Sequence, residues 1–411
     1  MWFVGVDSFY RIYVLYDEQT YIHLHKMKRY NLLIILSSLI ALLSCEKINY
    51  MYYLEKDSNI TFDLNYDVEP YIKALFPYTD KDGHQYISFQ NGFKNQIVFY
   101  DIQTKEMAFK IDLDIEGDNG VGFFLGYYID SLDSIYLTSL QLPEIYSVNK
   151  DGKINKKIYY GKSKDGNVLN ACNSLSFSYH PILKFNNNLF VLSECNRWKY
   201  PNPVSAMIDL NTGDVQELPF EYPRFNGADN KKKSAGVELY FSRCFNGNKF
   251  IYSFFYEEDI FITSIDHNIV KRVNVKSNYI DRVVMPNDYN GTLKSMCENP
   301  NYGNLLYDKY RNVYYRVCYL KTEIDNRENY MELWDFGRKI FSIIILDKNF
   351  NIIGETVFPE YTYNPNLMYI DEKGLYISEN HYKNTNYDDD KLIFRLFRLC
   401  KSKEKYNDSA V

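Results

Sequence analysis

The sequence predicts an all-β protein, and the arrangement that accounts for most of the chain is a six-bladed β-propeller. The first observation is composition: 41 of the 411 residues are Tyr and aromatic residues make up 17%, a bias that suits the half-buried faces of β-strands. The second is that the chain beyond its N-terminal part has no long helical periodicity and consists of short strand-like runs bounded by Asn, Asp, Gly and Lys. The third is that these runs recur as similar units.

The recurring unit is an apolar strand followed by Asp or Asn and a tight turn. These two residues suit such a turn because their side chains bond backbone amides two residues on and tolerate left-handed geometry. A strand-like run precedes each of these stretches, and another follows most of them. The stretches are QIVFYDIQTK (96–105), EIYSVNKDGK (144–153), SAMIDLNTGD (205–214), FITSIDHNIV (261–270) and SIIILDKNFN (342–351).

A sixth unit comprises LMYIDEKGLYIS (367–378) and KLIFRLFRL (391–399). Repeats at spacings of roughly fifty to eighty residues, with four-stranded β units, indicate propeller blades. The early run NITFDL (59–64) has no unit of its own. We expect it to complete the last blade beside 391–399, which closes the ring and leaves no free sheet edge. Seven blades, a pair of β-sandwiches or an irregular β-solenoid are the alternatives.

The N-terminal part contains a secretion signal, MKRYNLLIILSSLIALLSCEK (27–47). A short basic start, an apolar core and small residues at its end are typical of a signal peptide, and the apolar run is shorter than the roughly 20 residues of a bilayer-spanning helix. Its end, Leu42 to Cys45, resembles the lipobox of bacterial lipoproteins. In that family the peptidase cuts before the cysteine, here Cys45, which then carries the lipid chains. A buried core helix with an incidental cysteine is the alternative.

This interpretation divides the chain into five parts. The first is a leader that precedes a second methionine, Met27, and we expect it to reflect a start codon assigned too early. The others are the signal peptide, a tether, the propeller domain and a polar tail. In order, the five parts are residues 1–26, 27–44, 45–57, 58–400 and 401–411.

The lipobox-like end, the composition rich in Tyr, Asn and Lys, and blade motifs such as EIYSVNKDGK (144–153) resemble domain-of-unknown-function family 4221, a lipoprotein family of Bacteroides-type bacteria. The resemblance covers nearly all of the chain after Cys45. It implies a six-bladed propeller outside the cytoplasm and carries over no catalytic residue. Surface lipoproteins of such bacteria often have an acidic run after the cysteine, whereas CEKINYMYY (45–53) is balanced. We therefore expect a lipid anchor in the outer membrane, on its periplasmic side.

Composition and motifs also bear on function. The net charge of −6 gives no basic face for nucleic acid. The sequence has no phosphate loop, zinc helix or nucleophile elbow, so we expect no cofactor and no metal site, with DDDK (388–391) as a solvated loop. We expect a binding or scaffold domain for a protein partner or a glycan. The alternative is a hydrolase or lyase acting on glycans or peptides, which an acidic or histidine cluster at the channel mouth would indicate.

The ligand site of a propeller is expected at one mouth of its channel, where loops from all blades converge. The candidates are His180 in SYHP (178–181), Arg197 and Trp198 in CNRWKYPNP (195–203), and Arg243. An Arg with nearby aromatic rings can hold a carboxylate or stack on a sugar. Ordinary loop packing is the alternative.

Six cysteines follow Cys45, and an even number in an oxidising compartment permits disulfides. Cys172 and Cys195 flank the first strands of one unit and are the candidate pair; the absence of any disulfide is the alternative. Cys244 and Cys318 lie in strand-like runs and are expected as buried free thiols. One histidine, His267, follows a turn Asp and is expected to be exposed.

Overall fold

The computed structural model describes residues 50–69, 71–72, 74–92, 94–169, 176–193, 202–223, 240–286 and 292–403. The expected leader, signal peptide and lipidation residue Cys45 lie outside the described residues, as do Cys172, Cys195, Arg197 and Trp198. The described strands belong to one unit, Met51–Ser402, apart from their outermost residues Tyr50 and Lys403.

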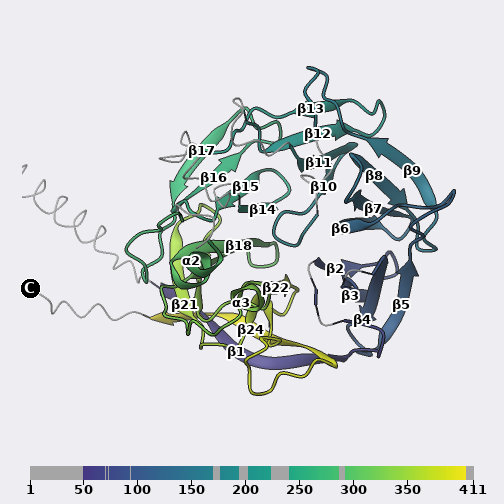
Figure 1. Ribbon diagram of the computed structural model, residues 1–411. Helices are drawn as coiled ribbons and strands as arrows, with labels where there is room; N and C mark the ends of the chain where they lie inside the picture. The colour runs from purple at the N-terminus through teal and green to yellow at the C-terminus, as the bar shows by residue number, and fades with distance from the viewer. Residues whose placement is uncertain are drawn as a thin grey trace, which may run out of the picture. The chain divides into compact units, whose positions relative to one another are not determined.

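Within the described residues, the strands form six antiparallel blades around a central channel (Figure 1). The first strand of each blade faces the channel and the last lies on the rim. The first three blades are β2 (Leu75–Thr79), β3 (Gln85–Gln90), β4 (Gln96–Asp101), β5 (Met107–Asp112); β6 (Phe124–Ser131), β7 (Ser134–Ser139), β8 (Glu144–Val148), β9 (Ile154–Tyr159); and β10 (Leu183–Phe185), β11 (Asn188–Leu192), β12 (Ser205–Asp209), β13 (Val215–Glu217). The all-β prediction and the six-bladed count are confirmed.

The other three blades of the ring follow the same order. Blade 4 is β14 (Phe241–Phe245), β15 (Phe250–Phe254), β16 (Asp259–Thr263), β17 (Val270–Asn274); blade 5 is β18 (Asn301–Asp308), β19 (Val313–Tyr319), β20 (Phe341–Leu346), β21 (Ile352–Val357); and blade 6 is β22 (Asn364–Ile370), β23 (Leu375–Ser378), β24 (Lys391–Lys403) and β1 (Tyr50–Asp63). Two short helices accompany blade 5, α2 (Thr292–Glu298) before β18 and α3 (Tyr330–Asp335) between β19 and β20.

The N-terminal strand β1 closes the ring, as predicted. It lies between β24 of blade 6 and β21 of blade 5, so that the two blades form one eight-stranded sheet. Its first half pairs in parallel with β21 through Tyr52 and Gly354, and a Cβ at Gly354 would lie only 1.8 Å from the Tyr52 carbonyl oxygen. The boundaries differ from expectation: β1 begins at Tyr50, so residues 50–57 belong to a strand and not to a tether, and β24 takes in residues 401–403 of the expected tail.

The turns between strands use the predicted Asp and Asn chemistry. The side-chain oxygen of Asp209 accepts a hydrogen bond from the Asn211 amide at 2.7 Å, and Asp347 does the same for Asn349 at 2.8 Å. These bonds satisfy amides that the tight turn removes from the sheet. The repeated Asp or Asn is therefore a turn signal that the fold uses.

The expectation that His267 is exposed is wrong. Its side chain is 1% exposed, and its backbone is left-handed, with φ +60°. Its Nε2 lies 2.5 Å from the Tyr252 hydroxyl and its Nδ1 lies 3.0 Å from the Ile265 carbonyl oxygen. Because the left-handed turn directs the ring inward onto Phe250, burial lowers the pKa of His267 to about 4.

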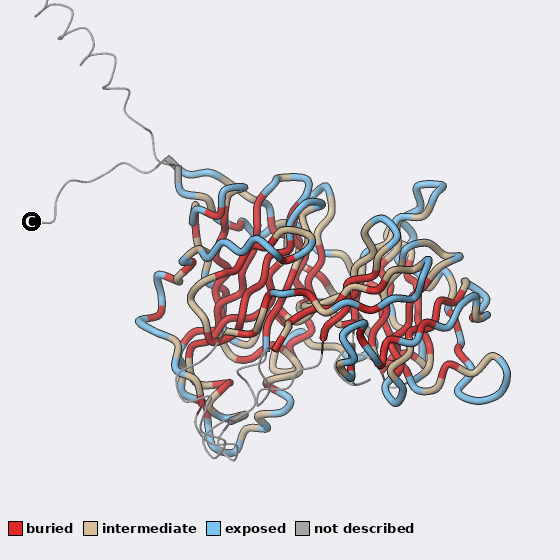
Figure 2. The backbone as a smooth tube through the Cα atoms, turned by 90° about the horizontal axis from the view of Figure 1, so that it is seen from above, coloured by how far each residue is buried: buried red, intermediate tan, exposed pale blue. Residues whose placement is uncertain are grey.

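The core lies between successive blades and not at one centre. One cluster joins Ile97 of blade 1 to Ile135 and Leu137 of blade 2, and another joins Phe190 of blade 3 to Tyr252 of blade 4. Figure 2 shows the buried positions concentrated in the strands and the exposed ones in the loops. Each blade is thereby fixed against its neighbours, and loops from different blades are held in a constant geometry.

Candidate functional site

A short segment, residues 176–181, crosses the central channel ahead of β10; we call it the crossing segment. Ser176 forms a parallel bridge with Gly126 of blade 2. Ser178 accepts a hydrogen bond from the Leu75 amide of blade 1 at 2.9 Å and donates to the Leu75 carbonyl at 3.1 Å. The carbonyl of Tyr179 accepts from the Arg243 amide of blade 4 at 2.7 Å. Ser178 of the SYHP stretch (178–181) therefore bonds to the first strand of blade 1.

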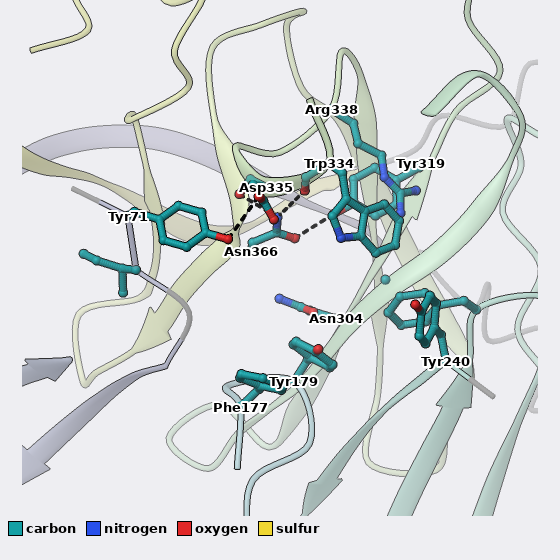
Figure 3. Close-up of a pocket in the computed structure, with 13 residues that line it drawn as sticks. Tyr71, Phe177, Tyr179, Tyr240, Asn304, Tyr319, Trp334, Asp335, Arg338 and Asn366 are labelled. Carbon is teal, nitrogen blue, oxygen red and sulfur yellow. Dashed lines mark hydrogen bonds between the residues drawn. The ribbon is translucent and has the colours of Figure 1, made fainter. Parts of the chain in front are cut away.

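The crossing segment lies between two cavities. Phe177 and Tyr179 line a cavity of about 270 Å³, which we call the mouth cavity, whereas Ser178 and Pro181 line a second cavity of about 250 Å³. The mouth cavity receives residues from blades 1, 4, 5 and 6 and from the crossing segment (Figure 3). Its lining residues are Tyr71, Ile72, Phe177, Tyr179, Tyr240, Phe255, Gly303, Asn304, Tyr319, Trp334, Asp335, Arg338 and Asn366.

The end of α3 brings Trp334 and Asp335 to the cavity, and the turn after it brings Arg338. The helix begins after Asn329, whose side chain accepts from the amides of Met331 and Glu332, a normal helix N-cap. Gly337 then turns the chain with φ +108°, and a Cβ there would lie 2.7 Å from Asn364 Cα. Only glycine can adopt this backbone conformation so close to Asn364. Gly337 therefore allows the chain to turn directly after α3, which places Arg338 at the edge of the cavity.

Asp335 is held by residues from two other blades. The hydroxyl of Tyr71 donates to its Oδ2 at 3.1 Å, and the amide of Asn366 donates to its carbonyl oxygen at 3.1 Å. Burial and the neighbouring carboxylate raise the pKa of Tyr71, so this hydroxyl keeps its proton and acts as the donor. Figure 3 shows this group of side chains at one side of the cavity.

Arg338 lies between two aromatic rings. Its guanidinium carbon is 3.7 Å from the ring centre of Tyr319 and 4.4 Å from that of Trp334. The side chain is 3% exposed. Its Nη1 donates to Asn301 Oδ1, and its backbone carbonyl accepts from His381 Nε2 at 2.8 Å. Stacking on both faces fixes the plane of the cation and excludes water from those faces.

Of the four ligand residues proposed from the sequence, Arg197 and Trp198 lie outside the described residues, and His180 and Arg243 do not line the mouth cavity. Arg243 is 1% exposed and donates to Ser205 Oγ and to the carbonyls of Pro181 and Phe190, all at 2.8–2.9 Å. It connects blades 3 and 4 and lines the second cavity. The ring of His180 lies against Tyr179 and Phe241 and is not among the residues that line the mouth cavity.

Sequence reasoning missed Trp334, Asp335 and Arg338. One signal could have identified them. The stretch between the strand-like runs at 312–320 and 342–346 is far longer than the tight turns of the other units, and it contains one of the three tryptophans of the chain. A long insertion within a regular repeat is a common place for functional residues.

The lining of the mouth cavity is mainly aromatic, with few charged side chains among the described residues. Aromatic rings make up seven of its described lining residues, and among these residues Asp335 is the one carboxylic acid and none is a histidine. Glycoside hydrolysis typically needs a pair of carboxyl groups across the bond to be broken, which these residues do not supply. They do supply ring faces, amide groups, one carboxylate and one guanidinium.

The four described cysteines are free thiols: Cys244, Cys297, Cys318 and Cys400. Cys318 is buried, as expected, whereas Cys244 is half-buried. Burial raises the pKa of both thiols, so neither is a reactive thiolate at neutral pH. No helix among the described residues is long and apolar enough to cross a membrane.

Comparisons with known proteins agree with this fold. The chain is similar to a crystal structure of a DUF4221 family member from Bacteroides vulgatus, with 26% identity, a TM-score of 0.76, and coverage of 87% of this chain and 100% of that one. It also resembles a Bacteroides fragilis protein whose name describes it as exported, with 9% identity, a TM-score of 0.50, and coverage of 85% and 96%. A search of curated proteins finds no match.

The family model described as "Domain of unknown function (DUF4221)" matches residues 51–357. The match begins within β1 and ends at the last residue of β21, so it includes five of the six blades and the turn that carries Arg338. Since the match covers well over half of the sequence and a crystallised member shares the fold, the chain belongs to the DUF4221 family.

Proposed function

We propose that this protein is a lipid-anchored, extracytoplasmic binding protein whose propeller holds a sugar residue of a glycan in the mouth cavity. Cys45 carries the anchor, and the propeller acts on the periplasmic side of the outer membrane. The observation that supports binding is the cavity itself, where aromatic rings from several blades surround a small number of fixed polar groups. Binding sites for small ligands commonly have this composition.

A sugar suits this cavity because it has both an apolar C–H face and hydroxyl groups. Trp334 offers a ring at the cavity wall, with Arg338 stacked on it at 4.4 Å. The Oδ1 atom of Asn304 accepts no hydrogen bond from any described residue, while its Nδ2 donates to the Pro365 carbonyl at 2.9 Å. This oxygen is therefore a fixed acceptor for a ligand hydroxyl.

The volume of the cavity sets the size of the ligand. An engineered cavity of about 150 Å³ holds a benzene molecule. The mouth cavity, at about 270 Å³, has room for one sugar ring with its substituents. We therefore expect the end of a glycan chain to enter, with the rest of the chain outside.

The location rests on different support. The signal ends in a lipobox-like sequence at Cys45, and the similar Bacteroides fragilis protein is named as exported. Two or more lipid chains are sufficient for stable membrane anchoring. A propeller of this kind would meet glycans or imported oligosaccharides close to the membrane.

The test is a glycan array probed with the protein and with Trp334→Ala. We expect selective binding by the protein and loss of that binding in the variant. The matched control is Tyr279→Ala, which removes an aromatic side chain that is 53% exposed and lies outside the cavity. Thermal unfolding of each variant shows whether it is folded. Binding that survives Trp334→Ala in a folded protein would contradict this location of the site.

A further inference from the structure

We infer that the sugar residue held in the mouth cavity carries a carboxylate, as in a hexuronic acid, and that Arg338 binds it. This inference rests on the proposed function, because it names the ligand class of the same cavity. Three features of the cavity support it: open donor atoms on Arg338, no carboxylate within ion-pair distance of Arg338 among the described residues, and acceptor oxygens on Asp335 and Asn304.

One edge of the Arg338 guanidinium is open. Its Nη1 donates a hydrogen bond to Asn301 Oδ1. Its Nε and Nη2 have no hydrogen-bond partner among the described residues. Neither of these two nitrogens is a fully enclosed unsatisfied atom, so both are in contact with open space. Nε and Nη2 form the side of a guanidinium that makes two parallel N–H···O bonds with one carboxylate. The stacking on Tyr319 and Trp334 leaves this edge as the place where a ligand can bind.

The charge of Arg338 has no counter-ion in the part of the chain that the structure describes. No carboxylate there lies within ion-pair distance of it, in contrast to the exposed Arg272 and the half-buried Arg395, which each pair with a carboxylate. A buried cation without an anion is costly, because the protein interior solvates it poorly. A ligand carboxylate would form an ion pair with Arg338, whereas a neutral sugar would leave the cation unpaired.

The other two buried arginines, Arg243 and Arg316, form no ion pair among the described residues either, but unlike Arg338 they have no donor that faces open space. All three nitrogens of Arg316 donate to described groups, four bonds in all, to Ser253 Oγ and to the carbonyls of Glu257, Glu258 and Val275. Arg243 makes three such bonds, and its remaining Nε is fully enclosed. Those two side chains hold blades together, whereas Arg338 has donors directed to an open cavity.

Two other polar groups that line the cavity have an acceptor oxygen that suits a ligand hydroxyl. Asp335 uses Oδ2 for Tyr71, and its Oδ1 has no partner among the described residues. Asn304 Oδ1 is the second such acceptor. A ligand with one carboxylate and several hydroxyls matches these groups, because its carboxylate can accept from Arg338 and its hydroxyls can donate to Asp335 and Asn304. A peptide C-terminus has the carboxylate but few hydroxyls, so these observations favour the acidic sugar.

The experiment measures binding of oligosaccharides that end in hexuronic acid, each paired with the same oligosaccharide after reduction of its carboxyl group to an alcohol. Isothermal titration calorimetry with the protein should show binding that is about 10- to 100-fold tighter for the acidic member, since hydrogen bonds to charged groups are worth more than neutral ones. Arg338→Lys keeps the positive charge but cannot form two parallel hydrogen bonds with one carboxylate. We expect it to lower the affinity for the acidic oligosaccharide and to leave the affinity for the reduced one unchanged. Arg327→Gln is the control, because Arg327 is 89% exposed and pairs with Asp325 outside the cavity.

The outcomes separate this inference from the proposed function. Equal affinity for the acidic and reduced members would overturn the carboxylate inference and leave glycan binding intact. Binding of a peptide carboxylate with no binding of either sugar would overturn both. The comparison of the two ligands needs no variant, so the inference stays open to refutation if Arg338→Lys does not fold.

Discussion

Replacing Phe62 by Ala tests whether β1 closes the ring by packing as well as by pairing. The Phe62 side chain is fully buried. Its ring contacts Tyr100 of blade 1 and Phe394 of blade 6 edge-on, with centroid distances of 5.9 and 6.4 Å. It therefore joins blade 6, which holds the first and last strands, to blade 1, and a cavity there would weaken the junction.

The magnitude follows from the size of the side chain and of the domain. A buried Phe→Ala change typically lowers the free energy of unfolding by about 3–5 kcal/mol. For a unit spanning Met51–Ser402, the entropy of unfolding is on the order of 0.7 kcal/mol/K, at about 2.1 cal/mol/K for each residue. The melting temperature should therefore fall by about 4–7 °C.

Differential scanning calorimetry measures this shift, with Tyr53→Ala as the control. Tyr53 is an aromatic residue on the same strand that is 36% exposed, and its loss should lower the free energy of unfolding by less than about 1 kcal/mol. If Phe62→Ala and Tyr53→Ala shift the melting temperature equally, β1 does not stabilise the ring through this contact, and the account of closure is refuted.

Three further predictions concern the anchor, the location and the buried His381. Cys45→Ala should release the protein from the membrane fraction; retention there, with no lipid on the N-terminal peptide of the unaltered protein, would contradict the anchor. Protease added to intact cells should leave the protein intact until the outer membrane is permeabilised, and digestion before that step would place it on the surface. Burial lowers the pKa of His381 to about 4 in the folded protein. As the pH drops below about 6.5, the His381 imidazole is therefore protonated in the unfolded chain before it is protonated in the folded one. The free energy of unfolding should fall by up to about 3 kcal/mol between about pH 6.5 and pH 4. Denaturant titrations across that range should show a smaller fall for His381→Gln, and an unchanged fall would mean that another group is responsible.

The fold was predictable because its signal is local and repeated. The Asp or Asn that ends a strand, as at Asp209 and Asp347, bonds its own turn, so its role does not depend on distant residues. The closing strand could be predicted as well, because 59–64 had no blade of its own. Its extent could not, since the pairing of Tyr52 with Gly354 joins residues about three hundred positions apart.

The site was less predictable because it depends on contacts between blades. Arg243 and Arg338 look alike in the sequence, as each lies near aromatic residues. The fold gives Arg243 the carbonyls of Pro181 and Phe190 and gives Arg338 one amide oxygen, that of Asn301. His267 illustrates the same limit, because a left-handed φ of +60° directs its ring inward, and a sequence shows the turn but not that direction.

A crystal structure of the protein with the tightest-binding oligosaccharide would test the central claim most directly. We predict that one terminal sugar ring lies in the mouth cavity beside Trp334 and Asn304, with its carboxylate on the Nε and Nη2 atoms of Arg338. A sugar bound in the second cavity or on an outer strand, with the mouth cavity unchanged from the unbound protein, would contradict the account.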